Sequence, residues 1–195
     1  MASQVEKIKQ LREETAAGMM DVKKALDESN GDVEGARRVL RERGQALAAK
    51  KSSREATEGL IESYVHFNGR VGVLVHVNCE TDFVARTPEF KEFCRNVALH
   101  VASMKPLCVA PEDIPAESVA EERQIAEKQA AEMGKPENIT RQIVEGRLKK
   151  WTSEQALLTQ DYVKEPDKTV GDLLHETIQK VGENVVIRRF IRYEL

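Results

Sequence analysis

The sequence has little net charge and no long apolar run, and each shortage excludes a class of protein. Its 30 basic and 33 acidic residues give a net charge of -3, which offers no attractive field to a phosphate backbone, so no nucleic-acid partner is expected. No stretch approaches the ~18 apolar residues that span a bilayer, and residues 1–7 lack the apolar run of a secretory signal. We therefore expect a cytoplasmic protein with no membrane partner.

The sequence also lacks the spacings of metal, nucleotide and catalytic sites. Neither G-x-x-x-x-G-K nor G-x-G-x-x-G occurs, so no direct nucleotide binding is expected. The histidines and cysteines show no H-x-x-x-H, H-E-x-x-H or C-x-x-C spacing (His66, His76, His100 and His175; Cys79, Cys94 and Cys108). We expect no metal, no cofactor, no disulfide framework and no catalytic residue.

What is present suits a folded chain with a small helical domain at its start. Of 195 residues, 41% are hydrophobic and 32% charged, which is close to globular usage. Apolar residues recur every three or four positions in three runs: Val5, Ile8 and Leu11; Val22, Ala25 and Leu26; Val33, Ala36, Val39 and Leu40. Asn30-Gly31 suits a turn, Asp32 can cap the third helix and Gly44 can end it. Residues 1–44 therefore predict a three-helix domain.

Residues 45–58 differ from their neighbours in composition. They are rich in alanine, lysine and serine and hold few apolar anchors. The segment reads as a partly helical linker, and a continuous solvated helix is an equal alternative because alanine and lysine favour helix.

Residues 59–195 predict an α+β core with a mainly antiparallel sheet. Two β-branched runs, 60–67 and 71–77, flank Asn68-Gly69, a dipeptide typical of hairpin turns. The valines of the second run alternate, so they share one buried face. Helices follow over 88–105, capped by Thr87, and over 116–133, 139–148 and 170–181, and a last strand covers 184–193. The second and third of these helices form a helical hairpin.

The segment between the β-hairpin and the Thr87 cap invites two interpretations. It reads Asn-Cys-Glu-Thr-Asp-Phe-Val-Ala-Arg over residues 78–86. On composition alone, Thr81 or Asp82 caps a helical turn and Phe83 is another aromatic of the core. Cys79 beside Glu80 is the best case for a catalytic thiol, although a free cysteine is usually structural.

The same segment resembles the Thr-Asp-Phe-Val-Ala signature of the elongation factor Ts family. Residues 11–26 are similar to the family's N-terminal signature, with Ala16 where that pattern usually has glycine, so the loop there is expected to be slightly stiffer. Gly134-Lys135-Pro136 and residues 145–150 and 190–194 resemble further landmarks in the same order. The resemblance covers essentially the whole chain.

This resemblance implies a fold and a function. The three helices correspond to a domain of the ubiquitin-associated type, and the chain looks like the short form of the family, which is expected to form homodimers. The implied activity is guanine nucleotide exchange: binding of the GTPase elongation factor Tu and release of its GDP and Mg²⁺ during translation elongation. Such a protein is not an enzyme.

The resemblance also implies which residues bind the partner. Asp82 and Phe83 contact the GTPase near its magnesium site, with Val84 and Ala85 in the same signature. The N-terminal domain binds the same GTPase through Arg12, Met19 and Met20, unless one methionine belongs to the core. Thr81 has a supporting role as a cap. Two further residues each keep an ordinary alternative: Arg86 is a local ion-pair partner or a solvated side chain, and His66 is a partner contact or a satisfied strand histidine.

Two other functions belong to different classes. One is an adaptor that binds ribosomes or polypeptides through its N-terminal domain, with the core as a dimeric scaffold. The other is a thiol enzyme that uses Cys79.

Overall fold

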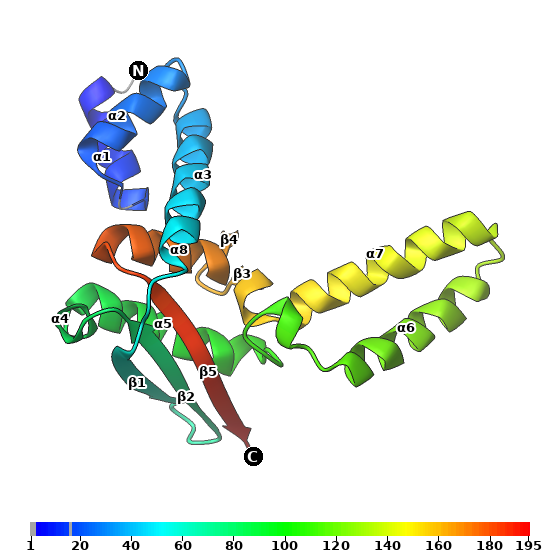
Figure 1. Ribbon diagram of the computed structural model, residues 1–195. Helices are drawn as coiled ribbons and strands as arrows, with labels where there is room; N and C mark the ends of the chain where they lie inside the picture. The colour runs from blue at the N-terminus through cyan, green and yellow to red at the C-terminus, as the bar shows by residue number, and fades with distance from the viewer. Residues whose placement is uncertain (1–2, 16) are drawn as a thin grey trace.

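The structure, a computed structural model, describes residues 3–15 and 17–195 (Figure 1). The prediction made for Ala16 lies outside the described residues. In chain order the elements are α1 (Gln4–Thr15), α2 (Met19–Glu28), α3 (Val33–Lys51), β1 (Glu58–Val65), β2 (Val71–Cys79), α4 (Asp82–Ala85), α5 (Pro88–Met104), η1 (Pro111–Asp113), α6 (Ala116–Ala131), α7 (Glu137–Gln155), η2 (Leu157–Thr159), β3 (Asp161–Tyr162), β4 (Glu165–Thr169), α8 (Val170–Val181) and β5 (Val185–Glu194).

The first three helices pack around their own small core, as their apolar spacing predicts. Its buried side chains include Leu11, Val22, Leu26 and Leu40. The turn before α3 forms where Asn30-Gly31 predicts it, with positive φ at both residues, and the Asp32 carboxylate accepts the first free amides of α3.

The third helix is longer than predicted. The expected end at Gly44 is wrong, because α3 continues to Lys51 and takes up half of the predicted linker. Gly44 lies beside the side chain of Gln179 in α8, and Ala48 belongs to the main core. One helix therefore joins the N-terminal cluster to the core.

A three-stranded antiparallel sheet in the order β1-β2-β5 forms the base of the core. Val73, Val75 and Val77 of the central strand are buried, as their alternation predicts, and Val71 is partly buried. Helix α5 packs on this inner face and α8 packs on α5. The α+β class is thus confirmed.

The two core helices begin at the residues that predicted them. Thr87 accepts the amide of Phe90 and Pro88 opens α5, while Thr169 and Asp172 form a reciprocal capping box at the start of α8. Gly182 ends α8 in the left-handed conformation. These caps fix the layer on which the sheet packs.

Helices α6 and α7 form the predicted helical hairpin, which projects from the core as a separate arm (Figure 1). Its small core consists of Ala126, Ala130, Val144 and Leu148, with Ile143 partly buried. The two-stranded β3-β4 hairpin that follows was not predicted. Among the described residues, the helices lack the length and the apolar composition that crossing a membrane requires.

Candidate functional site

Residues 81–86, here called the tip, follow the central strand of the sheet directly. The Thr81 hydroxyl accepts the amide of Val84 at 3.3 Å, so Thr81 caps α4 as predicted. Such a cap stabilises a helical turn by about 1 kcal/mol. A helix of four residues is not stable by itself, so it depends on its cap and on the packing of its side chains, and α4 has both.

The tip separates its apolar side chains into two groups. Val84 and Ala85 are buried at 5% and 8% exposure, whereas the neighbouring Phe83 is 77% exposed. The interpretation of Phe83 as a core aromatic is therefore wrong. Its ring stands in solvent on a turn that the core holds from below.

The charged residues of the tip pair with each other. The Arg86 guanidinium donates to the Asp82 carboxylate at 2.7 Å, one helical turn apart. Both side chains are more than half exposed, so this pair contributes at most ~1 kcal/mol. The ion-pair interpretation of Arg86 is confirmed, and both groups remain accessible to another molecule.

A residue that the sequence analysis missed holds the tip in place. One oxygen of the half-buried Glu183 carboxylate accepts the amides of Glu80 and Thr81 at 3.1 and 3.0 Å. The other oxygen accepts the Thr81 hydroxyl at 2.7 Å. Glu183 lies about a hundred residues away in sequence, between α8 and β5, so no local pattern points to it.

A second apolar surface lies on the N-terminal domain. Arg12 and Met19 line a groove of about 570 Å³ between α1 and α2, together with Val5, Ile8, Lys9 and Glu13. We call it the α1–α2 groove. Met19 and Met20 are 56% and 63% exposed, so neither belongs to the core. In Figure 1, α1, α2 and α4 lie on the side of the molecule opposite the helical hairpin.

The predicted contact residue His66 lies apart from both surfaces, near the turn of the β1-β2 hairpin. Its Nδ1 lies 2.9 Å from the Tyr64 hydroxyl, and its ring lies 4.4 Å from the Phe67 ring. These contacts fit a satisfied strand histidine. A contact between His66 and a partner stays a prediction.

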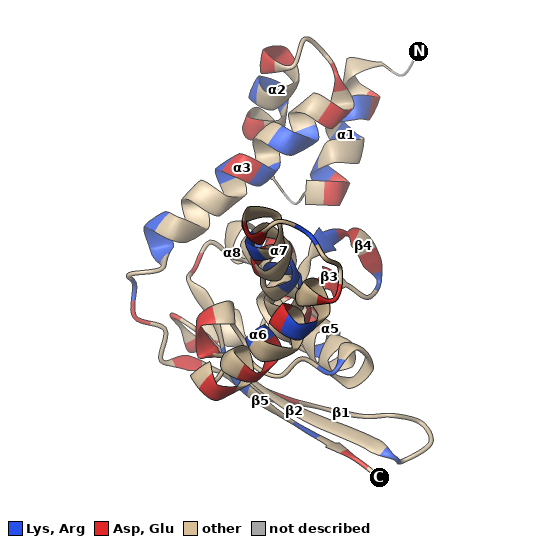
Figure 2. Cartoon of the chain, turned by 90° about the vertical axis from the view of Figure 1, so that its right-hand side faces the viewer, with Lys and Arg blue, Asp and Glu red and all other residues tan. Residues whose placement is uncertain are grey.

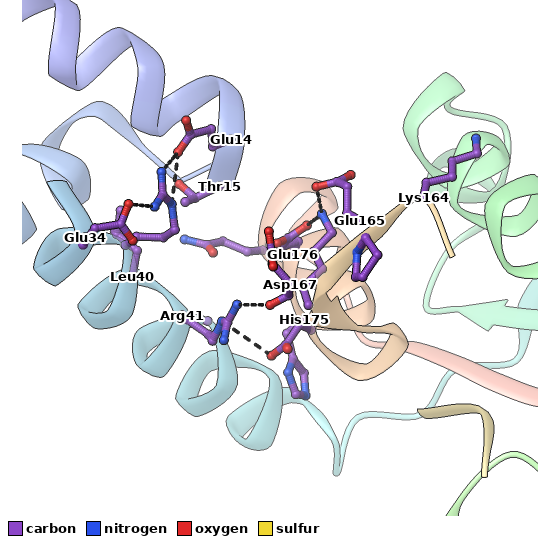
Figure 3. Close-up of a pocket in the computed structure, with 16 residues that line it drawn as sticks. Glu14, Thr15, Glu34, Leu40, Arg41, Lys164, Glu165, Asp167, His175 and Glu176 are labelled. Atoms are coloured by element: carbon purple, nitrogen blue, oxygen red, sulfur yellow. Dashed lines mark hydrogen bonds and ion pairs between the residues drawn. The ribbon is translucent and has the colours of Figure 1, made fainter. Parts of the chain in front are cut away.

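A groove of about 690 Å³ lies between α3 and the β4-α8 region (Figure 3). Arg41 of α3 donates to the Asp167 carbonyl at 3.2 Å and pairs with Asp172 at 3.9 Å. Burial raises the pKa of Asp172, but hydrogen bonds from Thr169 and the charge of Arg41 outweigh it, so the pKa is lowered. These contacts attach the N-terminal domain to the core.

The thiol of Cys79 does not suit nucleophilic chemistry. The side chain is buried, and burial raises its pKa to about 11, so the thiol stays protonated near neutral pH. Its sulfur contacts the Thr81 carbonyl at 3.1 Å. Among the described residues, no three potential ligands group together to hold a metal ion.

Comparison with known proteins decides between the remaining functions. The family described as elongation factor TS matches residues 2–195. The chain belongs to the elongation factor Ts family. It is 81% identical to elongation factor Ts of Rubrobacter xylanophilus over all of both chains. It is 53% identical to that of Desulfosudis oleivorans, covering 96% and 95% of the two chains, and 56% identical to that of Alkaliphilus oremlandii, covering 96% and 87%.

Membership of the elongation factor Ts family confirms the main functional prediction. The protein is a translation elongation factor that acts as the nucleotide exchange factor of elongation factor Tu, and it is not an enzyme. This also removes the thiol-enzyme alternative. Its place of action is the cytoplasm, as expected.

Proposed function

We propose that this member of the elongation factor Ts family releases GDP by inserting the Phe83 ring into elongation factor Tu, with Asp82 beside it. The observation that carries the proposal is the 77% exposure of Phe83 on a turn whose next two residues are buried. Most of this large apolar side chain is in contact with water rather than with its own chain. An apolar gap in a partner would cover it.

The task requires negative coupling between two ligands of one GTPase. Each tenfold loss of GDP affinity corresponds to about 1.4 kcal/mol, and the incoming nucleotide must weaken the exchange factor by the same factor. Mg²⁺ bridges the phosphate oxygens, so displacing the loop that holds it removes much of the grip on GDP. A rigidly seated ring can transmit such a displacement, while the Asp82 carboxylate orients it.

The α1–α2 groove supplies a second contact with the same GTPase. Methionine side chains are unbranched and polarizable, so Met19 and Met20 can adapt to an apolar partner surface, and Arg12 adds a charge at its rim. This contact holds the two proteins together while Phe83 acts.

The protein also forms a homodimer in this proposal, through the outer face of its sheet. Cross-strand pairing aligns Ser63, Leu74 and Ile191 in one row on the face away from α5. Ile61, Val65 and Tyr193 are exposed on the same face, and Arg189, which pairs with His76, is a charged residue of that face; Figure 2 shows the charged segments of β5. An apolar face of this kind suits a two-fold contact with its own copy.

Replacing the central Leu74 with lysine tests the dimer. Leu74→Lys places two like charges near the two-fold axis, so light scattering should report the monomer mass of 21.9 kDa where the parent gives twice that value. The matched control Leu107→Lys changes another exposed leucine outside the sheet and should leave the dimer intact. A parent that scatters as a monomer contradicts this proposal.

Removing the ring tests the insertion of Phe83. Phe83→Ala should fold normally and lower the rate of GDP release from elongation factor Tu by about thirtyfold, the effect of losing one buried aromatic anchor. Stopped-flow fluorescence of a labelled GDP measures this rate. Phe67→Ala removes the same ring from the opposite end of β2, where Phe67 is 92% exposed.

The control variant should change the rate by less than about twofold, as surface positions outside an interface do. Equal losses in the two variants would mean that any exposed ring contributes, and an unchanged rate in Phe83→Ala would remove the ring from the account.

A further inference from the structure

The turn between α8 and β5 touches the tip, the linker and the end of α3. The Lys51 ammonium at the end of α3 donates to the Gly182 carbonyl. The Asn184 side chain donates to the Arg54 carbonyl at 2.8 Å. Glu183, between these two residues, accepts two bonds from Thr81 of the tip and one from the amide of Glu80, the residue before it.

Residues 183–184 of this turn and residues 80–81 each supply a carboxylate that accepts backbone amides of the other. Glu183 accepts from the Glu80 and Thr81 amides and from the Thr81 hydroxyl, while the Glu80 carboxylate accepts the Asn184 amide at 2.6 Å. Arg54 pairs with Glu80 at 3.5 Å. Bonds to a charged carboxylate are stronger than bonds between neutral groups. The entry into α4 is therefore fixed at two successive peptide amides.

This arrangement determines where the Phe83 ring stands. The Thr81 hydroxyl donates to Glu183 and accepts from the Val84 amide, so one oxygen links the carboxylate to the first turn of α4. A hydroxyl has one donor and two acceptor sites, and both bonds fit that inventory. Without Glu183, two amides and the hydroxyl of Thr81 lose this partner. The anchors that remain are the buried Val84 and Ala85, the bond from the Asn184 amide to Glu80 and the contact of the Cys79 thiol with the Thr81 carbonyl.

We infer that Glu183 is a positioning residue for nucleotide exchange: its carboxylate fixes the 80–81 backbone, so that the Phe83 ring meets the GTPase already oriented. The inference rests on the proposed insertion of Phe83. Preorganisation reduces the ordering needed on contact, so its loss lowers the rate of displacement more than the affinity of the complex.

The test measures GDP release over a range of exchange-factor concentrations. Glu183→Ala should lower the maximal release rate about tenfold, with the half-saturating concentration changed less than about twofold. Glu183→Gln keeps an oxygen that accepts the two amides and should recover most of the rate. Glu145→Ala, which removes a carboxylate paired with Arg123 in the helical hairpin, is the control for loss of a surface pair and should keep the full rate.

A double substitution separates this inference from the proposal beneath it. If Glu183 acts through the ring, Glu183→Ala should leave the maximal rate of GDP release almost unchanged in a Phe83→Ala background. Losses that multiply, or a full rate in Glu183→Ala, overturn the positioning role. An unchanged rate in Phe83→Ala alone overturns the insertion of Phe83 instead.

Folding is measured separately so that no outcome is ambiguous. Circular dichroism should show the same helix content in each variant, and hydrogen exchange at the Glu80 and Thr81 amides should accelerate in Glu183→Ala but not in Glu183→Gln. If the alanine variant fails to fold, Glu183→Asp retracts the carboxylate by one methylene and should give a partial loss of rate. A full rate in that variant, with those amides exchanging freely, contradicts the inference.

Discussion

The tip and the α1–α2 groove both expose apolar side chains, but they hold them in opposite ways. At the tip, one aromatic ring stands on a four-residue helix whose next residues, Val84 and Ala85, are buried in the core. At the groove, the unbranched side chain of Met19 lies on a domain with a small core of its own, and the exposed Met20 is its neighbour in sequence. The first surface is rigid and the second is adaptable.

This difference divides the work of exchange between the two surfaces. A rigid ring resists being pushed back, so it can displace part of a GTPase, whereas an adaptable surface can only follow the shape that it meets. We expect the tip to set the maximal rate of GDP release. We expect the groove to set the concentration at which that rate is reached.

Removing Met19 of the groove together with its exposed neighbour Met20 should give the largest effect on that concentration. Met19→Ala with Met20→Ala removes two exposed apolar side chains, so the half-saturating concentration should rise about tenfold while the maximal rate stays within about twofold. Stopped-flow titration of GDP release gives both values. A fall in the maximal rate alone would erase the distinction between the two surfaces.

Replacing the rigid ring of the tip with a flexible side chain should give a smaller effect, and this effect should be on the maximal rate of GDP release. Phe83→Met keeps an apolar side chain but replaces a stiff ring with a flexible one, so the maximal rate should fall about fivefold at nearly constant half-saturating concentration. The same titration measures it. A full maximal rate in this variant would mean that apolar area, rather than rigidity, does the work.

Lowering the pH should give the smallest effect, a loss of stability in the core that the N-terminal domain does not share. Burial lowers the pKa of His100, whose Nδ1 accepts the Val163 amide at 3.2 Å and whose Nε2 bonds Gln160 at 2.9 Å. As pH falls through ~6.5, the unfolded chain binds a proton that the folded core refuses, so the free energy of unfolding falls. All four histidines lie between residues 66 and 175, outside the N-terminal domain, so that domain has no histidine to cause such a loss.

Hydrogen exchange at pH 7 and pH 5 would measure that difference. Protection of α5 should fall more than protection of α1 to α3. The pKa of His175 is lowered like that of His100, and the raised pKa of the half-buried Glu176 acts in the opposite direction. A comparison with His100→Gln isolates the contribution of His100, and an equal pH dependence in that variant would contradict it.

Much of the fold follows from local chemistry. Asn68-Gly69 makes the hairpin turn, with Gly69 at φ 68°, and Thr87 and Thr169 cap the helices that they predict. Each signal acts within four residues of its effect, so the sequence alone reveals it. The segment 81–86 was also located from sequence, through its resemblance to a known family.

What sequence reasoning missed depends on contacts between distant segments. A glycine usually ends a helix, but Gly44 faces α8, and packing against that helix carries α3 on to Lys51. Phe83 is exposed because the core covers its neighbours Val84 and Ala85 but not its ring, and this depends on the packing of distant elements. Glu183 reaches the tip from about a hundred residues away, and no periodicity encodes such a bond.

The central claim is that the Phe83 ring leaves water and enters the GTPase. The chain has a single tryptophan, Trp151, so Phe83→Trp in a Trp151→Phe background places one fluorophore at the tip. Quenching by acrylamide should be strong for the free protein, because position 83 is exposed, and should fall several-fold in the nucleotide-free complex with elongation factor Tu. A tryptophan that stays equally quenchable in an exchange-active complex would contradict the account.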